Sequence, residues 1–487
     1  MSPQGRGVGK ADLDHADWAE DPPARERRAR SERRAAERRA AERRGRAASA
    51  PAPERRGTTS ERRRAARRDE VARPRRRPAV ATRASRSKGA LMPGPGVAER
   101  RAVVLVTFLL VVYGLVMAYS ASSAEAYFRY DSSFYFVKRQ LLWVLLGVGG
   151  MWVLSRVDYG WWRRAAVPLA SLVLVGLVAV LVPSIGTSIN GARRWIFVGG
   201  QGLQPSEFAK LAAVVLVAAL IVRRPRAIES PAGFAWLVAI SILPAGLLIM
   251  MEPDLGTTLV LTVAVAAVLV AAGARLRYLF SLVVAGCLAV LAVIAVEPYR
   301  LERLVTFFDP WKDPQGSGYQ ATQSLISIAS GRILGVGLGS SVQKFGFLPE
   351  QGTDMITGII GEELGLIGLV VLLALYVTLA WACFRIALNC KELFGKLLAT
   401  GITAIVIGQA CINVGAALGL LPLTGVPLPL VSLGGTSLVV VLAGLGILLN
   451  IATNRRSYIV VSAQRGDRAA RGGGDRRSPA AGTRRRG

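Results

Sequence analysis

Ten apolar runs, each close to the about 20 residues that a helix needs to cross a bilayer, lie between residues 102 and 453. Apolar runs of this length and number are typical of helices that span a membrane, because a helix satisfies its own backbone hydrogen bonds there. We therefore predict an all-α polytopic membrane protein with ten transmembrane helices. They are expected at residues 102–121, 140–156, 165–183, 207–222, 233–251, 256–273, 278–296, 355–383, 397–419 and 433–453.

Most of the formal net charge of +29 lies outside this body, in residues 1–101 and 454–487. The N-terminal segment is of low complexity and rich in Arg, Ala and Glu, and it has no apolar face to bury, which predicts disorder. The tails serve either as soluble segments that fix orientation or as docks for anionic lipid or an acidic partner. Nucleic acid is not an expected partner.

The positive charges of the short loops predict the orientation of the chain. An even number of helices places both termini on one side, and the loops that hold Arg163, Arg164, Lys391 and Lys396 share that side. The positive-inside rule makes it cytoplasmic. Residues 102–453 then form one membrane domain between two cytoplasmic tails.

One connection, residues 297–354 between the seventh and eighth helices, is far longer than a typical loop. Its aromatic and aliphatic residues predict a folded segment, and its place in the helix order puts it on the extracytoplasmic side. A folded amphipathic loop over a membrane body indicates a site at the outer boundary between lipid and water.

Asp354 lies where this loop meets the eighth helix, and four glycines, Gly358, Gly361, Gly365 and Gly368, follow it on one helical stripe. Small residues on a stripe either let another helix approach closely or leave a groove. Asp354 is accordingly either a functional carboxylate over a groove or a solvated acid at a helix start.

Other polar residues gather at the expected helix mouths. Arg193 and Arg194 are predicted to lie outside, and Glu207 and Lys210 lie one helical turn apart, where they either contact substrate or neutralise each other. The segment "PLTGVPLPLVSLGGTS", residues 422–437, contains three prolines, so its backbone must be satisfied by protein, water or ligand. Cations, carboxylates and irregular backbone on the outer side suit an anionic amphipathic substrate, such as a lipid-linked phosphate.

Two kinds of chemistry are excluded for the membrane body. The single histidine, His15, lies in the N-terminal tail, which excludes histidine catalysis in the helices. There is no Walker A pattern, so nucleotide hydrolysis by that route is not expected.

Seven motifs resemble those of the SEDS family (shape, elongation, division and sporulation), which includes FtsW, RodA and SpoVE. They are "NGARRWI", "QPSEFAKL", "EPDLGTTLV", "DPWKDPQGSGYQATQS", "GLGSSVQKFGFLPE", "TDMITGIIGEELG" and "PLPLVSLGGTS", in the family's order and spacing. The chain is most similar to the FtsW branch. The resemblance implies a peptidoglycan glycosyltransferase that polymerises lipid II at the outer face of the cell membrane, at the division septum. The family's essential aspartate corresponds to Asp354.

The resemblance also implies roles and partners. Asp354 would act as general base and polyprenyl pyrophosphate would leave, with Arg193, Arg194 and Lys344 stabilising its charge. The expected substrate-binding residues are Arg193, Arg194, Glu207, Lys210, Lys344, Glu350, Thr353 and Ser432. No metal site of the protein's own is expected, although a divalent cation could accompany the pyrophosphate. The implied partners are lipid II, a class B penicillin-binding protein (an FtsI-like transpeptidase) and other divisome proteins.

Alternatives stay open at this point. A RodA-type elongation role or a sporulation role would keep the chemistry and change the setting. Ten helices with broken junctions also fit a lipid II flippase, and a scaffold that only recruits a transpeptidase is a third class. Ionisable residues at the outer edge rather than at the midplane favour the enzyme.

Overall fold

The computed structural model describes residues 96–189, 191–296 and 306–472. Most of the predicted tail of residues 1–101, residues 297–305 of the long loop and the end of the C-terminal tail lie outside these residues. The described part belongs to one compact unit.

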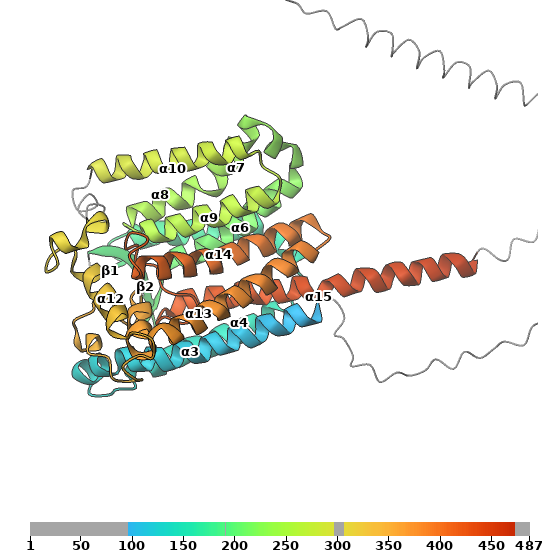
Figure 1. Cartoon of the computed structure of the whole chain (residues 1–487). Coiled ribbons are helices and arrows are strands. Elements are labelled where there is room, and N and C mark those ends of the chain that lie inside the picture. Colours follow the sequence, from blue (N-terminus) through green and yellow to red (C-terminus); the bar gives the residue numbers. More distant parts are fainter. Residues whose placement is uncertain (1–95, 190, 297–305, 473–487) are drawn as a thin grey trace, which may run out of the picture. The chain divides into compact units, whose positions relative to one another are not determined.

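A bundle of helices forms the body of the chain (Figure 1). Each predicted segment coincides with a helix, except that the fifth is divided between two helices. The helices are α3 (Val97–Tyr130), α4 (Tyr135–Leu154), α5 (Gly160–Leu181), α6 (Pro205–Arg223), α7 (Pro231–Ser241), α8 (Leu243–Met251), α9 (Leu255–Ala271), α10 (Leu276–Val296), α13 (Ile356–Asn389), α14 (Leu393–Ala417) and α15 (Gly435–Gly472).

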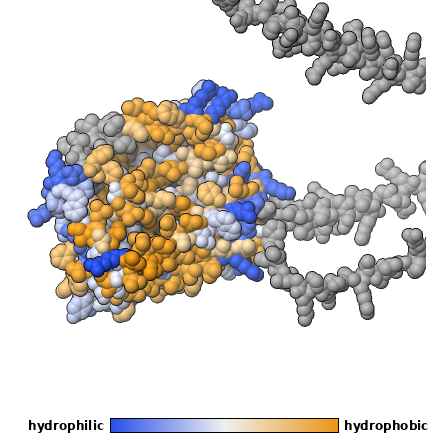
Figure 2. All heavy atoms as spheres, viewed as in Figure 1, coloured by the Kyte–Doolittle hydropathy of each residue, from blue (hydrophilic) through white to orange (hydrophobic). Residues whose placement is uncertain are grey.

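Among the described residues, seven helices are long and apolar enough to cross a membrane, and α7 with α8 would make an eighth span. Shorter apolar helices are α9 and the part of α10 up to Leu288. The space-filling view shows a largely apolar surface with polar residues toward both ends (Figure 2). A polytopic membrane protein is thereby confirmed, while the count of ten spans stays a prediction.

The division of the fifth segment has a local cause. The axes of α7 and α8 differ by 41°, and the first turn of α8 contains Pro244. Proline has no N–H to continue the hydrogen bonds of a preceding helix, so the chain bends there. A second difference concerns α15, which continues to Gly472 instead of ending at residue 453, so the helix extends into the predicted disordered tail.

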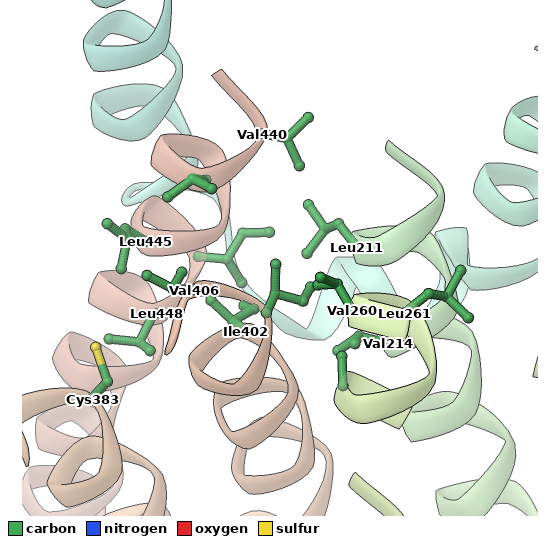
Figure 3. Packing of buried hydrophobic residues seen from close by; sticks show 14 of the residues in the cluster. Leu211, Val214, Val260, Leu261, Cys383, Ile402, Val406, Val440, Leu445 and Leu448 are labelled. Atoms are coloured by element: carbon green, nitrogen blue, oxygen red, sulfur yellow. The ribbon is translucent and has the colours of Figure 1, made fainter. Parts of the chain in front are cut away.

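The core lies where α14 meets α6, α9 and α15 (Figure 3). Val214, Leu261, Val406 and Leu445, one from each helix, are buried there. Their branched side chains fill the space between the helices and fix the relative positions of the helix ends, where the polar loops lie.

The prediction of an all-α fold is wrong in one place. Three short strands form an antiparallel sheet in the order β1-β2-β3, with bounds β1 (Thr187–Ile189), β2 (Ala192–Val198) and β3 (Gln201–Leu203). Gly199 and Gly200, both with positive φ, connect β2 to β3. A two-residue glycine turn matches the twist of a hairpin, so this pair of glycines was the overlooked signal.

The described part of the long loop, residues 306–355, is folded. It contains the helix α12 (Tyr319–Ser330) and two short 3-10 turns, η2 (Pro310–Lys312) and η3 (Gln343–Phe345). α12 packs against α13 and α14. In Figure 1, α12 and the sheet lie at the same end of the bundle.

The helix α13 is interrupted at Gly365, whose φ is 63° and ψ is −160°. The segment that follows α12 pairs with the interruption: Leu366 N donates to Arg332 O over 2.9 Å, and Val336 N donates to Glu362 O over 3.0 Å. A Cβ on Gly331 would lie 1.9 Å from Gly361 O. The predicted glycine stripe is therefore broken, and it serves close packing with the α12 segment instead of leaving a groove.

Candidate functional site

A cavity of about 730 Å³ opens where α3 ends and α4 begins. Three cationic side chains line it, from Arg129 of α3, Arg139 of α4 and Lys344 of the long loop. Phe128 and Trp143 are among its aromatic residues. Guanidinium and ammonium groups beside aromatic rings suit an anionic ligand that also carries rings or apolar groups.

Contacts with buried groups hold Lys344 at the edge of this cavity. Its Nζ donates to Gly339 O and lies 3.7 Å from Glu363 Oε1. The residue is only 5% exposed. Its ammonium group is therefore held in place, and the Glu363 carboxylate offsets part of its charge.

Glu362 and Glu363 connect the long loop to the helices. Glu363 accepts from Ser120 Oγ of α3, at 2.7 and 2.6 Å to its two oxygens. Glu362 accepts from Val342 N over 2.9 Å and from Ser341 Oγ over 2.5 Å. Through these hydrogen bonds Glu362 and Glu363 hold the long loop against α13 and α13 against α3.

The turn that carries Asp354 is anchored from three directions. Leu433 N donates to Gly352 O over 2.8 Å, and Ser432 Oγ donates to Thr353 O over 2.5 Å. Asn413 Nδ2 donates to Asp354 O over 2.8 Å. Three consecutive carbonyl groups are thus held by residues of α14 and of the segment before α15.

Asp354 itself is half-buried and lies one residue before Met355, the N-cap of α13, which makes no side-chain cap bond. Both predicted roles of Asp354, a functional carboxylate and an acid at a helix start, stay predictions. Its neighbour Thr353 lines the cavity together with Glu350, and Thr353 Oγ1 bonds to Glu350 Oε2 over 2.8 Å. Asp354 Oδ2 lies 3.3 Å from the position that a Cβ on Gly425 would take.

The proline-rich segment, residues 422–437, is satisfied by protein side chains. Asn413 donates a second bond to Val426 O over 2.8 Å, and Gln409 Nε2 donates to Pro427 O over 2.9 Å. Ser432 Oγ accepts from Leu428 N over 2.8 Å. Protein side chains are thus among the predicted partners of this backbone.

Glu207 and Lys210 lie in the core. Their charged groups are 2.8 Å apart, and their side chains are 2% and 1% exposed. Lys210 Nζ also donates to Gln409 Oε1 over 3.0 Å. The two residues neutralise each other and do not line the cavity, and a role in substrate binding stays a prediction.

The predicted cations of β2 point elsewhere. Arg194 Nε donates to Glu252 O over 2.9 Å, and Arg193 donates to Leu181 O over 3.4 Å. Neither lines the cavity. The structure therefore brings Lys344, Glu350, Thr353 and Ser432 close to the Asp354 turn and leaves Arg193 and Arg194 at the sheet.

The sequence analysis missed Arg129, Arg139 and Asn413. The first two belong to "FRYDSSFYFVKRQ", residues 128–140, where basic residues alternate with aromatic ones at a helix mouth. That pattern could have been recognised. Asn413 lies with Gln409 in an otherwise apolar run, and a polar residue inside a membrane helix is itself a signal of function.

Glu252 lies in the turn between α8 and α9, outside both helices, and it is fully buried. Neither carboxyl oxygen has a hydrogen-bond partner among the described residues. Burial, and secondly the charge of Asp254, raise the pKa of Glu252 to about 8, although Arg194 opposes the shift.

This raised pKa predicts a pH-dependent stability. The folded chain holds a proton that the unfolded chain releases above its ordinary pKa near 4.5, so stability falls as the pH rises from there to about 8. We expect Glu252→Gln to remove this fall and to be more stable at pH 8.5, by on the order of 1–4 kcal/mol. Thermal unfolding in detergent at pH 5 and 8.5 measures it, and an unchanged pH dependence in the variant would contradict it.

Within the described residues, no group of three or more His, Cys, Asp or Glu side chains could hold a metal ion.

Comparison with known proteins places this geometry in context. The family model for the FtsW/RodA/SpoVE cell cycle proteins matches residues 100–457. Stage V sporulation protein E of Bacillus subtilis is 41% identical over 355 residues, which cover 73% of this chain and 97% of that protein. A probable peptidoglycan glycosyltransferase FtsW of Geobacter metallireducens is 39% identical over 356 residues, covering 73% and 94%.

Two solved structures are also similar. A chain of a peptidoglycan synthase complex, described for its coordination of polymerization and crosslinking, has a TM-score of 0.60 at 31% identity and covers 72% of this chain and 97% of its own. The rod shape determining protein RodA of Thermus thermophilus has a TM-score of 0.53 at 28% identity and covers 72% and 96%.

Proposed function

Because this chain belongs to the FtsW/RodA/SpoVE family of cell cycle proteins, we propose that its cavity and the Asp354 turn together form the active site of a peptidoglycan glycosyltransferase. The substrate is lipid II. The observation that supports the residue assignment is the triple anchoring of the carbonyls of residues 352–354 beside a cavity with three cations. A reaction that displaces pyrophosphate needs a base near the attacking hydroxyl and positive charge near the departing phosphate groups.

In the proposed reaction Asp354 is the general base. The 4-hydroxyl of the acceptor sugar gives its proton to the Asp354 carboxylate while its oxygen forms a bond to C1 of the donor sugar. The bond between C1 and the pyrophosphate oxygen breaks, and its electron pair leaves with the polyprenyl pyrophosphate. A leaving group this stable needs no general acid, in contrast to the paired carboxylates of glycoside hydrolases.

The donor pyrophosphate is assigned to the cavity lined by Arg129, Arg139 and Lys344. Arg129 is paired with Glu125 over 3.2 Å and is well exposed. Arg139 is half-buried, so its charge is less screened by solvent. A divalent cation that accompanies the substrate would take phosphate oxygens as ligands and would add to the same positive charge.

We expect Arg139→Ala to raise the KM for lipid II by about tenfold or more, because it removes a charge-assisted bond to the pyrophosphate. Lys138→Ala is the matched control, since Lys138 is the exposed neighbour on the same helix and does not line the cavity. The measurement is polymerisation at varied lipid II. Equal KM values for the two variants would place the pyrophosphate elsewhere.

The family also supports partners and a location. The similar complex is described by both polymerization and crosslinking, which supports a class B penicillin-binding protein as the crosslinking partner of this chain. We place the protein in the cell membrane, at the division septum with other divisome proteins. The sporulation relative is as similar as the FtsW relatives, so a sporulation role is the second candidate, and RodA-type elongation is the third.

Polymerisation of lipid II by the purified full chain, with and without its class B partner, tests the function. Glycan strands are the expected product. If a competent complex makes none while a liposome assay detects movement of lipid II across the bilayer, the flippase alternative replaces the enzyme. If neither activity is found, the scaffold alternative replaces the enzyme.

A further inference from the structure

A second cavity, of about 600 Å³, lies between the described part of the long loop and the end of α14. Phe307, Phe308, Tyr319 and Gln320 line it from the loop and α12. Leu421 and Leu423 line it from the segment that follows α14. The function proposed above assigns no ligand to this space.

Residues near Asp354 border both cavities, although Asp354 itself lines neither. Pro349 lines both of them, and Thr353, the residue before Asp354, lines the first. On the other side, Asp354 Oδ2 lies 3.3 Å from where a Cβ on Gly425 would be, and Leu423, two residues before that glycine, lines the second cavity. A general base must reach the attacking hydroxyl of one sugar close to the reacting carbon of the other, so a turn that borders both cavities suits a reaction between two sugars, one in each cavity.

The two cavities differ in charge. The first is lined by three cations, Arg129, Arg139 and Lys344, and by two acids, Glu125 and Glu350, whereas every described residue that lines the second is uncharged. The second combines aromatic rings with the amide of Gln320 and the hydroxyls of Thr306 and Ser317. Apolar rings with a few polar groups are typical of sites for neutral ligands such as sugars.

We propose that the second cavity binds the acceptor sugar, the one whose 4-hydroxyl attacks, and that the first cavity binds only the donor. This assignment rests on the proposed glycosyltransferase function and deepens it. The donor reacts at the carbon that bears its pyrophosphate and therefore needs the cations. The acceptor reacts at an uncharged hydroxyl, for which an uncharged aromatic cavity is sufficient.

The test separates the two substrate roles with a labelled lipid II analogue whose 4-hydroxyl is capped, so that it can donate but cannot accept. The full chain with its class B partner transfers the label from this analogue to unlabelled lipid II. Varying lipid II at a saturating concentration of the capped analogue, which then occupies the donor site, gives the KM of the acceptor. Varying the capped analogue gives the KM of the donor.

We expect Gln320→Ala and Tyr319→Ala to raise the acceptor KM by about tenfold with the donor KM changed less than about twofold, since each removes a hydrogen bond or a ring contact. Arg139→Ala is expected to raise the donor KM by about tenfold and to change the acceptor KM by less than about twofold. Trp311→Ala is the matched control, because Trp311 is an exposed aromatic residue of the same loop that does not line the cavity. Tyr319→Phe keeps the ring and separates loss of the hydroxyl from loss of packing.

Unchanged acceptor KM values in both cavity variants, or a rise in the donor KM instead, would overturn the assignment while leaving the enzyme in place. If the wild-type complex transfers no label, the proposed function fails, and the assignment fails with it.

Discussion

Asp354→Asn is expected to lower the rate of lipid II polymerisation by at least about 10²-fold, below detection in a gel assay of glycan strands. Asparagine keeps the size and the backbone of aspartate, so the bond from Asn413 to the carbonyl of residue 354 can persist. What is lost is the capacity to accept a proton. The variant should therefore fold, insert into membranes and bind its class B partner like the wild type.

The control for this result is Asp309→Asn. Asp309 is an exposed acid of the same long loop, makes no side-chain cap bond to η2 and lines neither cavity. Its replacement removes the same charge from the same loop and should leave the rate within about twofold. Glycan strands of normal length from Asp354→Asn would remove Asp354 as the base and keep the rest of the site.

Lys210→Met has the second large expected effect, on stability. It leaves the Glu207 carboxylate buried beside an uncharged neighbour, and a broken buried ion pair typically costs about 3–5 kcal/mol. Thermal unfolding of the detergent-solubilised protein should show a clearly lowered midpoint.

The double variant Glu207→Gln with Lys210→Met completes the test, because it removes the stranded charge. It should regain most of the lost stability, while equal stability of Lys210→Met and wild type would contradict the buried pair. The polymerisation rate of the stable double variant then decides the remaining question. A normal rate makes the pair structural, and a lost rate supports the predicted role in substrate binding.

The positions of the helices could be predicted from the sequence because each apolar run determines its own element. Even the bend between α7 and α8 has its cause, Pro244, inside the run. The break in α13 has no such local cause. Gly365 is one of several regularly spaced glycines. The helix is interrupted at this glycine because residues 332–336, which precede α13 in the chain, pair with the backbone there.

The site was predictable only in part, for the same physical reason. Lys344, Glu350, Thr353 and Asp354 lie close together in sequence, so two neighbouring motifs contain them. Arg129 and Arg139 join them only through the packing of α13 on α3 and of α3 on α4. Arg193 and Arg194 were expected in the site because they are cationic, but carbonyl groups near the sheet take up their hydrogen bonds.

The interruption at Gly365 divides α13 into a short and a longer helical part. The short part, from Ile356, adjoins the Asp354 turn and is tied by Glu362 and Glu363 to the loop and to α3. The longer part, ending at Asn389, packs in the membrane bundle, and its first turn is also held by the loop and by α3, since Leu366 N donates to Arg332 O over 2.9 Å and Tyr113 Oη donates to Gly368 O over 3.3 Å. The segment that follows α12 thus holds both parts of α13 at the break, so a displacement of this segment would move the turn that carries Asp354 and the first turn of the longer part together.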